Sequence, residues 1–246
     1  MPIPSIPLRM EKREENRTLQ FIETMTLTTS YHIFVKEFVS EFRTRYALNA
    51  LLMFVVTTLS IILFSIGKES PTQDILSGTL WIVIFFSAMS GLSRTFVAEE
   101  ERGTSMTLRL LVNSSSVYIG KLLYNFILIL FLSLIIAVSY LLFINEFEVK
   151  SYEIFWITIF LGSAGLASAS TILAAIIAKA NTKGTLFPVL AFPILLPLLL
   201  TCINATKLST EGAFLTEAVK EFQILISFTV VMVATSFLVF DFVWKD

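Results

Sequence analysis

The chain has 246 residues, of which 55% are hydrophobic and only 15% are charged, and its mean hydropathy is +0.80. This composition excludes an ordinary soluble globular protein, in which about a quarter of the residues are charged. Lys and Arg number 18 against 19 Asp and Glu, so the formal net charge is −1. The chain therefore lacks the basic surface that nucleic-acid binding needs. A membrane protein without a nucleic-acid partner is the class that remains.

The N-terminal segment contains prolines and charges of both signs but no apolar central stretch, so it does not read as a secretory signal. We expect residues 1–30 to form a flexible N-terminal extension, with Met10 and Met25 as alternative starts. Residues 31–246 then form a single transmembrane domain.

Aromatic residues recur every fourth position after this extension, at Phe34, Phe38, Phe42 and Tyr46. The spacing predicts an amphipathic helix whose apolar stripe lies in the lipid headgroup boundary. The alternative is that the first membrane helix simply projects into the cytoplasm. The only histidine, His32, lies on this helix, where a surface position is favoured over an axial haem ligand.

Six long runs without any charge follow, each of 19 to 25 residues. They cover residues 46–67, 75–93, 122–145, 154–178, 184–206 and 222–240. Each can cross about 30 Å of hydrocarbon as a helix. Buried helices of a large soluble protein are the alternative, but such helices are rarely so long and so free of charge. The sequence therefore predicts an all-α polytopic membrane protein with six transmembrane helices.

The orientation follows from the Lys and Arg residues, which are in excess in cytoplasmic segments. With six spans, fourteen of these residues fall on the side that holds both termini and four on the other side. Both termini are therefore predicted to be cytoplasmic.

The longest predicted cytoplasmic connection, residues 94–121, combines a dense charged stretch with a short apolar one. The charged stretch is Glu99, Glu100, Glu101 and Arg102, ending at Gly103; Thr104 or Ser105 can then cap a short helix that carries Met106, Leu108, Leu110 and Leu111. Such a helix on a charged hairpin suits docking into a groove of a cytoplasmic partner, and a solvated loop is the alternative. Residues 113–116 should cap the next helix, which is expected to enter the membrane at about residue 121.

Three features inside or beside the spans concern the backbone. Small residues in the fourth run, including Gly162, Gly165 and Ala169, predict a closely packed interior helix. Pro188, Pro193 and Pro197 predict that the fifth helix is kinked or partly unwound. This helix is a candidate moving or path-lining element, with static kinking as the alternative. Residues 207–221 are expected to form either a surface helix or a partial re-entrant segment.

The sequence also excludes several kinds of chemistry. It contains neither the phosphate-binding motif G-x-x-x-x-G-K-[ST] nor the zinc motif H-E-x-x-H. A single His cannot supply a three-nitrogen metal site, and the single Cys202 is expected to pack as a small apolar residue. No charged residue lies in the middle of a predicted span, which argues against a proton-coupled pump or an ion channel with an acidic ring. We therefore expect no catalytic residues, no metal site and no enzyme activity.

Several segments, taken in chain order, resemble one family of transporter components. They are EFRTRYALNALL, FVAEEERGTSMTLRLLVNSSSVYIGKLLYN, LGSAGLASASTILAAIIAKA, TLFPVLAFPILLPLLL and FDFVWKD. Together they are similar to the haem exporter permease (CcmB-like) of the cytochrome c maturation ABC transporter, from about residue 31 to the end. One departure is that Val112 and Asn113 stand where a proline is common.

The resemblance implies a type-2 ABC exporter permease fold with an N-terminal interfacial helix and a cytoplasmic coupling helix. The coupling helix would be seated in a separate ABC ATPase subunit, to which ATP binds, and Glu99 to Gly103, Met106 and Leu110 would belong to this coupling hairpin. The implied partners are that ATPase, a second permease copy, a haem-handling membrane protein and a periplasmic haem chaperone, in the bacterial inner membrane. ATP would drive either haem export or release of the haem-loaded chaperone, so haem is cargo and the chain binds no cofactor of its own. Two alternatives are a type-2 ABC permease for another cargo, such as a lipid-linked glycan or a drug, and a non-transporting membrane scaffold.

Overall fold

The computed structural model describes residues 26–41, 46–66, 71–92, 96, 99, 103, 105–179 and 187–245, and these residues form helices and connecting turns without a strand. An N-terminal helix covers residues 26–41. It is followed by α2 (Tyr46–Ile66), α3 (Gln73–Leu92), α5 (Ser105–Leu111), α6 (Ser114–Phe143), α7 (Tyr152–Lys179), α8 (Phe187–Glu211) and α9 (Val219–Lys245).

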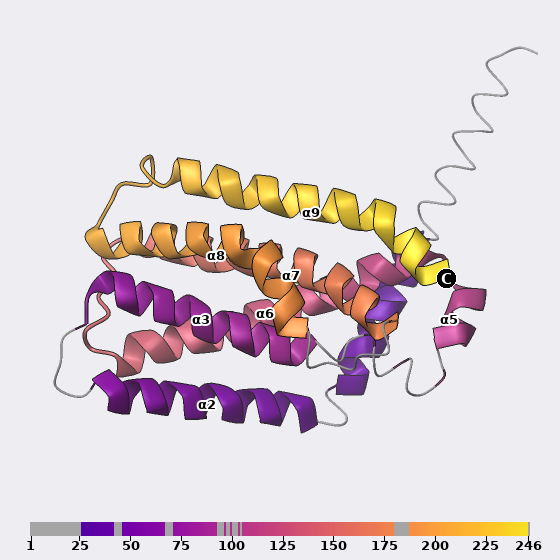
Figure 1. Ribbon diagram of the computed structural model, residues 1–246, viewed down its shortest axis with the longest axis horizontal. Coiled ribbons are helices and arrows are strands. Elements are labelled where there is room, and N and C mark those ends of the chain that lie inside the picture. Colours follow the sequence, from indigo (N-terminus) through magenta and orange to yellow (C-terminus); the bar gives the residue numbers. More distant parts are fainter. Residues whose placement is uncertain are drawn as a thin grey trace, which may run out of the picture.

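Within the described residues, six helices are long and apolar enough to cross a membrane, namely α2, α3, α6, α7, α8 and α9. This confirms the prediction of an all-α polytopic membrane protein with six spans. The six helices run side by side as one bundle (Figure 1). α7 lies at its centre and contacts α6, α8 and α9 most extensively. α2 packs mainly on α3, and α2 and α9 are the two least buried of the six helices.

The small residues of α7 allow close packing of its neighbours. A Cβ atom at Gly162 would overlap Cη2 of Trp81 in α3, and one at Gly165 would lie 2.5 Å from Cδ1 of Leu198 in α8. Ala169, one turn further, is fully buried. The absence of side-chain bulk along this face therefore lets α3 and α8 pack directly on the backbone of α7.

α8 is bent but remains helical. Pro193 and Pro197 lie inside the helix, whereas Pro188 occupies its second residue, where a missing N–H breaks no helical bond. Figure 1 shows the N-terminal part of α8 turning away from the direction of the rest of the helix. Of the two predicted outcomes, a kink or partial unwinding, the structure shows the kink.

Several helices extend beyond the charge-free runs of the sequence. α6 begins at Ser114, in agreement with the predicted cap at residues 113–116, so Lys121 lies within it, and α8 continues past Lys207 to Glu211. Charged residues are accommodated in these extensions because Lys121 is buried within protein, while Lys207 pairs with Asp74 of α3 at 2.9 Å. Cutting the sequence at each charge therefore finds every span but shortens the helices.

Residues 207–221 form neither a surface helix nor a re-entrant segment, so both expectations for them are wrong. α8 occupies the first part of this stretch until Gly212, whose φ of +82° ends the helix, and residues 212–218 form turns that lead to α9 at Val219. The end of α8 is held because the backbone N–H groups of Lys150 and Ser151 both donate to the carbonyl of Ser209, at 3.0 and 2.9 Å. These bonds tie the end of α8 to the connection between α6 and α7.

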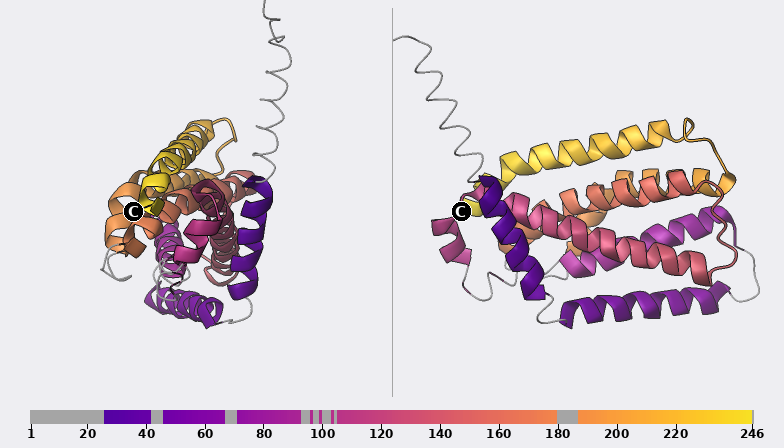
Figure 2. Two further views of the ribbon diagram at one scale, coloured as in Figure 1. Left: turned by 90° about the vertical axis from the view of Figure 1, so that its right-hand side faces the viewer. Right: turned by 180° about the vertical axis from the view of Figure 1, so that it is seen from behind.

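The N-terminal helix is separate from α2 and lies across one end of the bundle, as the second view in Figure 2 shows. It already includes residues 26–30, which the sequence places in the flexible extension. Ser30 and Ile33 are buried, whereas Leu27 and Tyr31 are 58% and 62% exposed. Its backbone approaches α6 closely at Gly120, where a Cβ would lie only 2.7 Å from the carbonyl oxygen of Ser30. The close approach is possible because residue 120 has no side chain.

Candidate functional site: the α5 hairpin and its charge ring

The features that the sequence associates with partner binding gather at one end of the bundle. The N-terminal helix, α5, the start of α6 and the end of α9 all lie at this end (Figures 1 and 2). α5 projects beyond the ends of the long helices, so its surface is accessible from outside the bundle. We call the segment from residue 96 to residue 113 the α5 hairpin.

α5 presents large apolar side chains that the rest of the chain does not cover. Met106, Leu110 and Leu111 are 70%, 80% and 77% exposed. Gly103, just before the helix, has a φ of +67°, a conformation that side chains rarely adopt, and so allows the sharp turn into α5. After the helix, the N–H of Val112 donates to the carbonyl of Leu108 at 3.0 Å, a bond that a proline at this position could not make.

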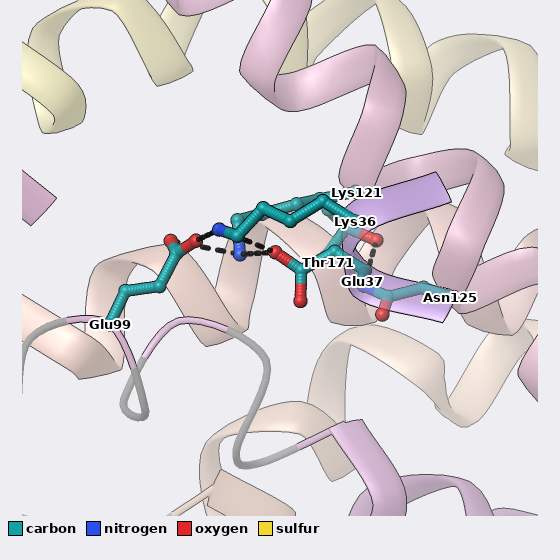
Figure 3. A network of polar contacts seen from close by, with 6 residues as sticks. All are labelled: Lys36, Glu37, Glu99, Lys121, Asn125 and Thr171. Atoms are coloured by element: carbon teal, nitrogen blue, oxygen red, sulfur yellow. Dashed lines mark hydrogen bonds and ion pairs between the residues drawn. The ribbon is translucent and has the colours of Figure 1, made fainter. Parts of the chain in front are cut away.

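The first part of the α5 hairpin is fixed by a closed ring of four alternating charges (Figure 3). Glu99 lies 2.5 Å from Lys36 and 3.0 Å from Lys121. Glu37 lies 3.1 Å from Lys121 and 3.4 Å from Lys36, which closes the ring. Two residues of the N-terminal helix, one of the hairpin and one of α6 thus meet in a set with no net charge. We call this set the charge ring.

Lys121 is the most buried member of the charge ring. Its side chain is fully buried, those of Glu99 and Glu37 are 9% and 15% exposed, and that of Lys36 is 47% exposed. Its ammonium also lies 4.6 Å from the centre of the Phe96 ring, a favourable cation–π position. A buried charge without a partner destabilises a protein by several kcal/mol, whereas a paired one is close to neutral. The ring therefore specifies where the three segments meet more than it adds to overall stability.

The electrostatics keep Glu99 and Lys36 ionised. Burial works to raise the pKa of the Glu99 carboxyl, but the ammonium groups of Lys121 and Lys36 hold it below its ordinary value of 4.5. Burial works to lower the pKa of Lys36, but its hydrogen bond to Glu99 and the charge of Glu37 raise it above 10.5. The ion pair between Lys36 and Glu99 is therefore formed at neutral pH.

Polar contacts continue from the charge ring into the centre of the bundle. One turn beyond Lys121 on α6, the side-chain amide of Asn125 donates to Thr171 Oγ1 of α7 at 2.9 Å, and both side chains are buried. Figure 3 shows this bond beside the charge ring. The site is thus joined to α7, the central helix, through α6.

The end of α9 holds the other side of the hairpin. Phe96 packs against Phe240 and Trp244, with ring centroids 5.9 and 6.3 Å apart. The guanidinium of Arg109 on α5 lies 5.4 Å from the centre of the Trp244 ring. A cavity of about 520 Å³ opens here, lined by Thr26, Arg109, Val112, Asn113, Ser114, Ser115, Asp241 and Trp244. The α5 hairpin is therefore held between charges on one side and aromatic rings on the other.

The structure brings together only some of the residues that the sequence singles out. Glu99, Gly103, Met106 and Leu110 lie at the α5 end, as the hairpin prediction requires, whereas Glu100, Glu101 and Arg102 lie outside the described residues. The proline and glycine positions lie elsewhere, along α8 and α7. Asn113 takes the N-cap position of α6, but its side chain makes no capping hydrogen bond.

Sequence reasoning misses three members of the charge ring, Lys36, Glu37 and Lys121. The available signal is Gly120 followed by Lys121, because a glycine permits close approach of another backbone and a lysine beside it must then find carboxylates. From the sequence, residue 121 indicates only the point at which the third span enters the membrane, and this interpretation does not predict a contact with the N-terminal helix. The long separation along the chain hides the partners.

Groups that bind metals do not gather in the part of the chain that the structure describes, where no three His, Cys, Asp or Glu side chains lie together. His32 is exposed on the N-terminal helix. Cys202 is fully buried in α8, where its sulfur lies 2.9 Å from the position of a Cβ on Gly162. The site combines ion pairs, aromatic packing and an exposed apolar helix, an arrangement that suits binding of a protein.

Comparison with known proteins assigns this arrangement to a family. Residues 28–242 match the family described as CcmB protein, from the N-terminal helix to the last turn of α9. No curated protein matches the chain. With six spans and a match over nearly its whole length, the chain belongs to the CcmB family and is a multi-pass membrane protein of the kind that forms the permease component of an ABC transporter in haem export and cytochrome c maturation.

Proposed function

We propose that this chain couples ATP hydrolysis in a separate ATPase subunit to haem export, or to release of a haem-loaded chaperone, at the periplasmic side of the bacterial inner membrane. The observation that carries the proposal is the exposed apolar face of α5, formed by Met106, Leu110 and Leu111 at one end of the bundle. Burial of large apolar side chains outside the spans by a partner removes them from water and stabilises the complex. A groove on the ATPase is the proposed partner surface.

The rest of the hairpin supports a role in transmitting force. An isolated loop would yield when pushed, but Glu99 and Phe96 fix this hairpin to the N-terminal helix, α6 and α9. Movement imposed on α5 would thus reach the membrane helices. Because the chain lacks a phosphate-binding motif, the nucleotide is bound by the partner. The excess of Lys and Arg at this end supports a cytoplasmic position for it and for both termini.

Further partners follow from the family and are part of the proposal. A second permease copy would pair with this one, and the pair would rest on two ATPase subunits. A haem-handling membrane protein and a periplasmic haem chaperone would complete the assembly. The bend of α8 at Pro193 and Pro197 makes this helix a candidate moving or path-lining element. A permease for another cargo would bind its ATPase through the same α5 surface. A scaffold without transport activity would use this surface only to recruit partners.

Docking is tested by replacing Leu110, which is 80% exposed, with a charged residue. Leu110→Glu should leave expression and folding of the permease intact but abolish co-purification with the ATPase and stimulation of its hydrolysis. Phe214→Glu is the matched control, because Phe214 is 76% exposed in the turn between α8 and α9 at the other end of the bundle. Retention of the ATPase by Leu110→Glu, or its equal loss in both variants, would contradict the proposed docking surface.

The cargo is tested by measuring covalently bound haem in a strain that lacks the gene, with and without complementation. Loss of all c-type cytochromes, restored by the gene, supports the maturation role. Unchanged c-type haem in the absence of a compensating paralogue would instead favour another cargo. Normal maturation by a chain that cannot stimulate the ATPase would favour the scaffold.

A further inference from the structure

The charge ring joins the α5 hairpin to the N-terminal helix more directly than to any membrane span other than α6. Of its four ion pairs, Lys36–Glu99 and Glu37–Lys121 cross from the N-terminal helix to other segments, whereas Lys36–Glu37 lies within that helix. Lys121–Glu99 joins the hairpin to α6. Lys121 is thus the point at which hairpin, N-terminal helix and α6 all meet.

Contacts between the N-terminal helix and the bundle are concentrated at the same place. The backbone of this helix approaches α6 at Gly120, next to Lys121, where a Cβ would lie 2.7 Å from the Ser30 carbonyl and 2.8 Å from the Ile33 Cβ. The helix has three distinct faces: Ser30, Ile33 and Glu37 toward α6, Leu27 and Tyr31 outward, and Lys36 toward the hairpin. It therefore rests on the pair Gly120 and Lys121 and is attached to the hairpin through charges.

We propose that the charge ring makes the N-terminal helix a moving part of the coupling machinery, with Lys121 as the positioning residue. When α5 is displaced by its partner, Glu99 moves with it, and the ion pairs carry Lys36 and Glu37 in the same direction. Separating the segments instead would leave buried charges unpaired, which costs several kcal/mol. The N-terminal helix, the α5 hairpin and the start of α6 therefore move together. This inference rests on the proposed function, since it takes the ATPase as the source of the displacement.

The ring allows the two halves of this linkage to be separated without changing its net charge. The double variant Lys36→Gln, Glu37→Gln, here called the released variant, removes the ion pairs that join the N-terminal helix to the other segments. It leaves the contact of this helix at Gly120 and the Lys121–Glu99 pair, at 3.0 Å, between hairpin and α6. Reversing all four charges restores the alternating order and serves as the rescue variant. Lys207→Gln combined with Asp74→Asn is the matched control, because it removes an ion pair of 2.9 Å at the other end of the bundle.

Movement is measured with pairs of spin labels on the full chain, with Cys202 replaced by alanine. Val39 on the N-terminal helix, Met106 on α5 and Ile176 on α7 are 56%, 70% and 41% exposed, so labels there do not disturb the core. In the permease alone, the distance between Val39 and Met106 should have a narrow distribution. It should broaden in the Lys36→Gln, Glu37→Gln variant and narrow again in the rescue variant. An unchanged distribution in the released variant would overturn the inference while leaving the proposed function intact.

The second measurement uses the assembled transporter with and without trapped ATP. Here the hairpin is labelled at Asn113, which is exposed and lies outside the docking face. Trapping should shift the distances from Ile176 to Asn113 and from Ile176 to Val39 together. In the released variant the first shift should remain and the second should be reduced, and the control variant should behave as the unmodified chain. A Val39 label that does not move while Asn113 does, or that moves equally in the released variant, would overturn the inference. An Asn113 label that never responds to nucleotide would instead overturn the proposed function, and the transmission with it.

Discussion

Gly162 in α7 faces the six-membered ring of Trp81 in α3, and a Cβ at that glycine would overlap Cη2 of the indole. No side chain fits into that space, so the contact exists only because residue 162 has none. The indole is held in place at its other edge, where Nε1 donates a hydrogen bond of 2.8 Å to Thr206 of α8. Trp81 thus joins three helices in the middle of the bundle.

We predict that Gly162→Ala destabilises the protein by about 1–3 kcal/mol, the usual range for overpacking a tightly filled core. The rigid indole cannot turn away without losing its bond to Thr206. The measurement is the thermal unfolding midpoint of the purified protein in detergent. Gly78→Ala in α3 is the control, because a Cβ there meets nothing within 4 Å and alanine favours the helix. Equal midpoints for the two variants would show that the packing of α3 on α7 is looser than described.

Replacing Thr206 by valine tests the hydrogen bond of Trp81 independently of the packing. The change keeps the shape of the side chain and leaves the buried indole N–H without its partner, at a cost of about 0.6–2 kcal/mol for a bond inside a membrane protein. Thr206→Ser should retain the bond and most of the stability. Chemical unfolding of the two variants in the same detergent distinguishes them, and a serine variant as unstable as the valine variant would point to packing instead.

The charge ring predicts a definite response to pH. The lowered pKa of Glu99 means that its contribution to stability is complete above 4.5 and is lost as pH falls through the lowered value. The raised pKa of Lys36 means that its contribution is complete below 10.5 and is lost as pH rises through the raised value. Stability from the ring should therefore be constant across neutral pH and decrease at both extremes.

This response is measured as the unfolding midpoint between acid and neutral pH for the unmodified chain and for Glu99→Gln. The unmodified chain should lose more stability than the variant on acidification, since the variant has no carboxylate to protonate at residue 99. Parallel curves would show that the Lys36 and Lys121 ion pairs of Glu99 do not stabilise the folded state.

The bend of α8 predicts a separation of stability from function. Pro193→Ala supplies an N–H for the carbonyl of Val189 and removes the ring that bends the helix, so stability should stay equal or rise, because an interior proline disfavours a helix by about 3 kcal/mol. If α8 moves or lines a path, the amount of c-type haem should fall while the amount of permease in the membrane does not. Pro188→Ala is the control, since a proline at the second helical residue breaks no helical bond. Normal haem content with Pro193→Ala would identify the bend as static.

The positive φ of Gly103 predicts that different side chains at this position weaken ATPase binding to different extents. Its φ of +67° disfavours alanine by about 1–2 kcal/mol, although a Cβ would meet nothing within 4 Å. Gly103→Ala should therefore weaken ATPase binding by about five- to thirtyfold if the strain is relieved by moving α5. Asparagine tolerates this conformation, so Gly103→Asn should bind nearly as well as the unmodified chain. Titration of the ATPase against both variants measures the difference.

The spans were predictable because the bilayer imposes a length and an absence of charge that a single sequence displays directly. Helix ends were less predictable, because a charge ends a run in the sequence but not a helix that has found a counter-charge. Lys121 shows this most clearly, since it lies inside α6 and inside the protein. The small residues of α7 and the prolines of α8 were also visible in advance, because they act through the backbone of their own helix.

The candidate site was predictable only in its local part. Met106 and Leu110 are recognisable from adjacent residues as part of a short apolar helix. Glu99, in contrast, forms ion pairs with Lys36 and Lys121, which lie far from it in the sequence. The alternating order of the four charges is a property of three segments brought together by folding. Six spans predict that the end of α9 returns to the side of the α5 hairpin, but no local pattern predicts that Phe240 packs on Phe96.

The contact between Phe96 and the last turns of α9 also bears on how the protein is made. The α5 hairpin leaves the ribosome long before Phe240 and Trp244 exist, so its aromatic support is missing during most of synthesis. Until the final helix has been inserted, the hairpin is held by the ion pairs of Glu99 with Lys36 and Lys121 but not by these rings. Docking of an ATPase to α5 would therefore favour completed permeases over nascent or truncated ones. Incomplete chains would thus be less readily assembled into the transporter.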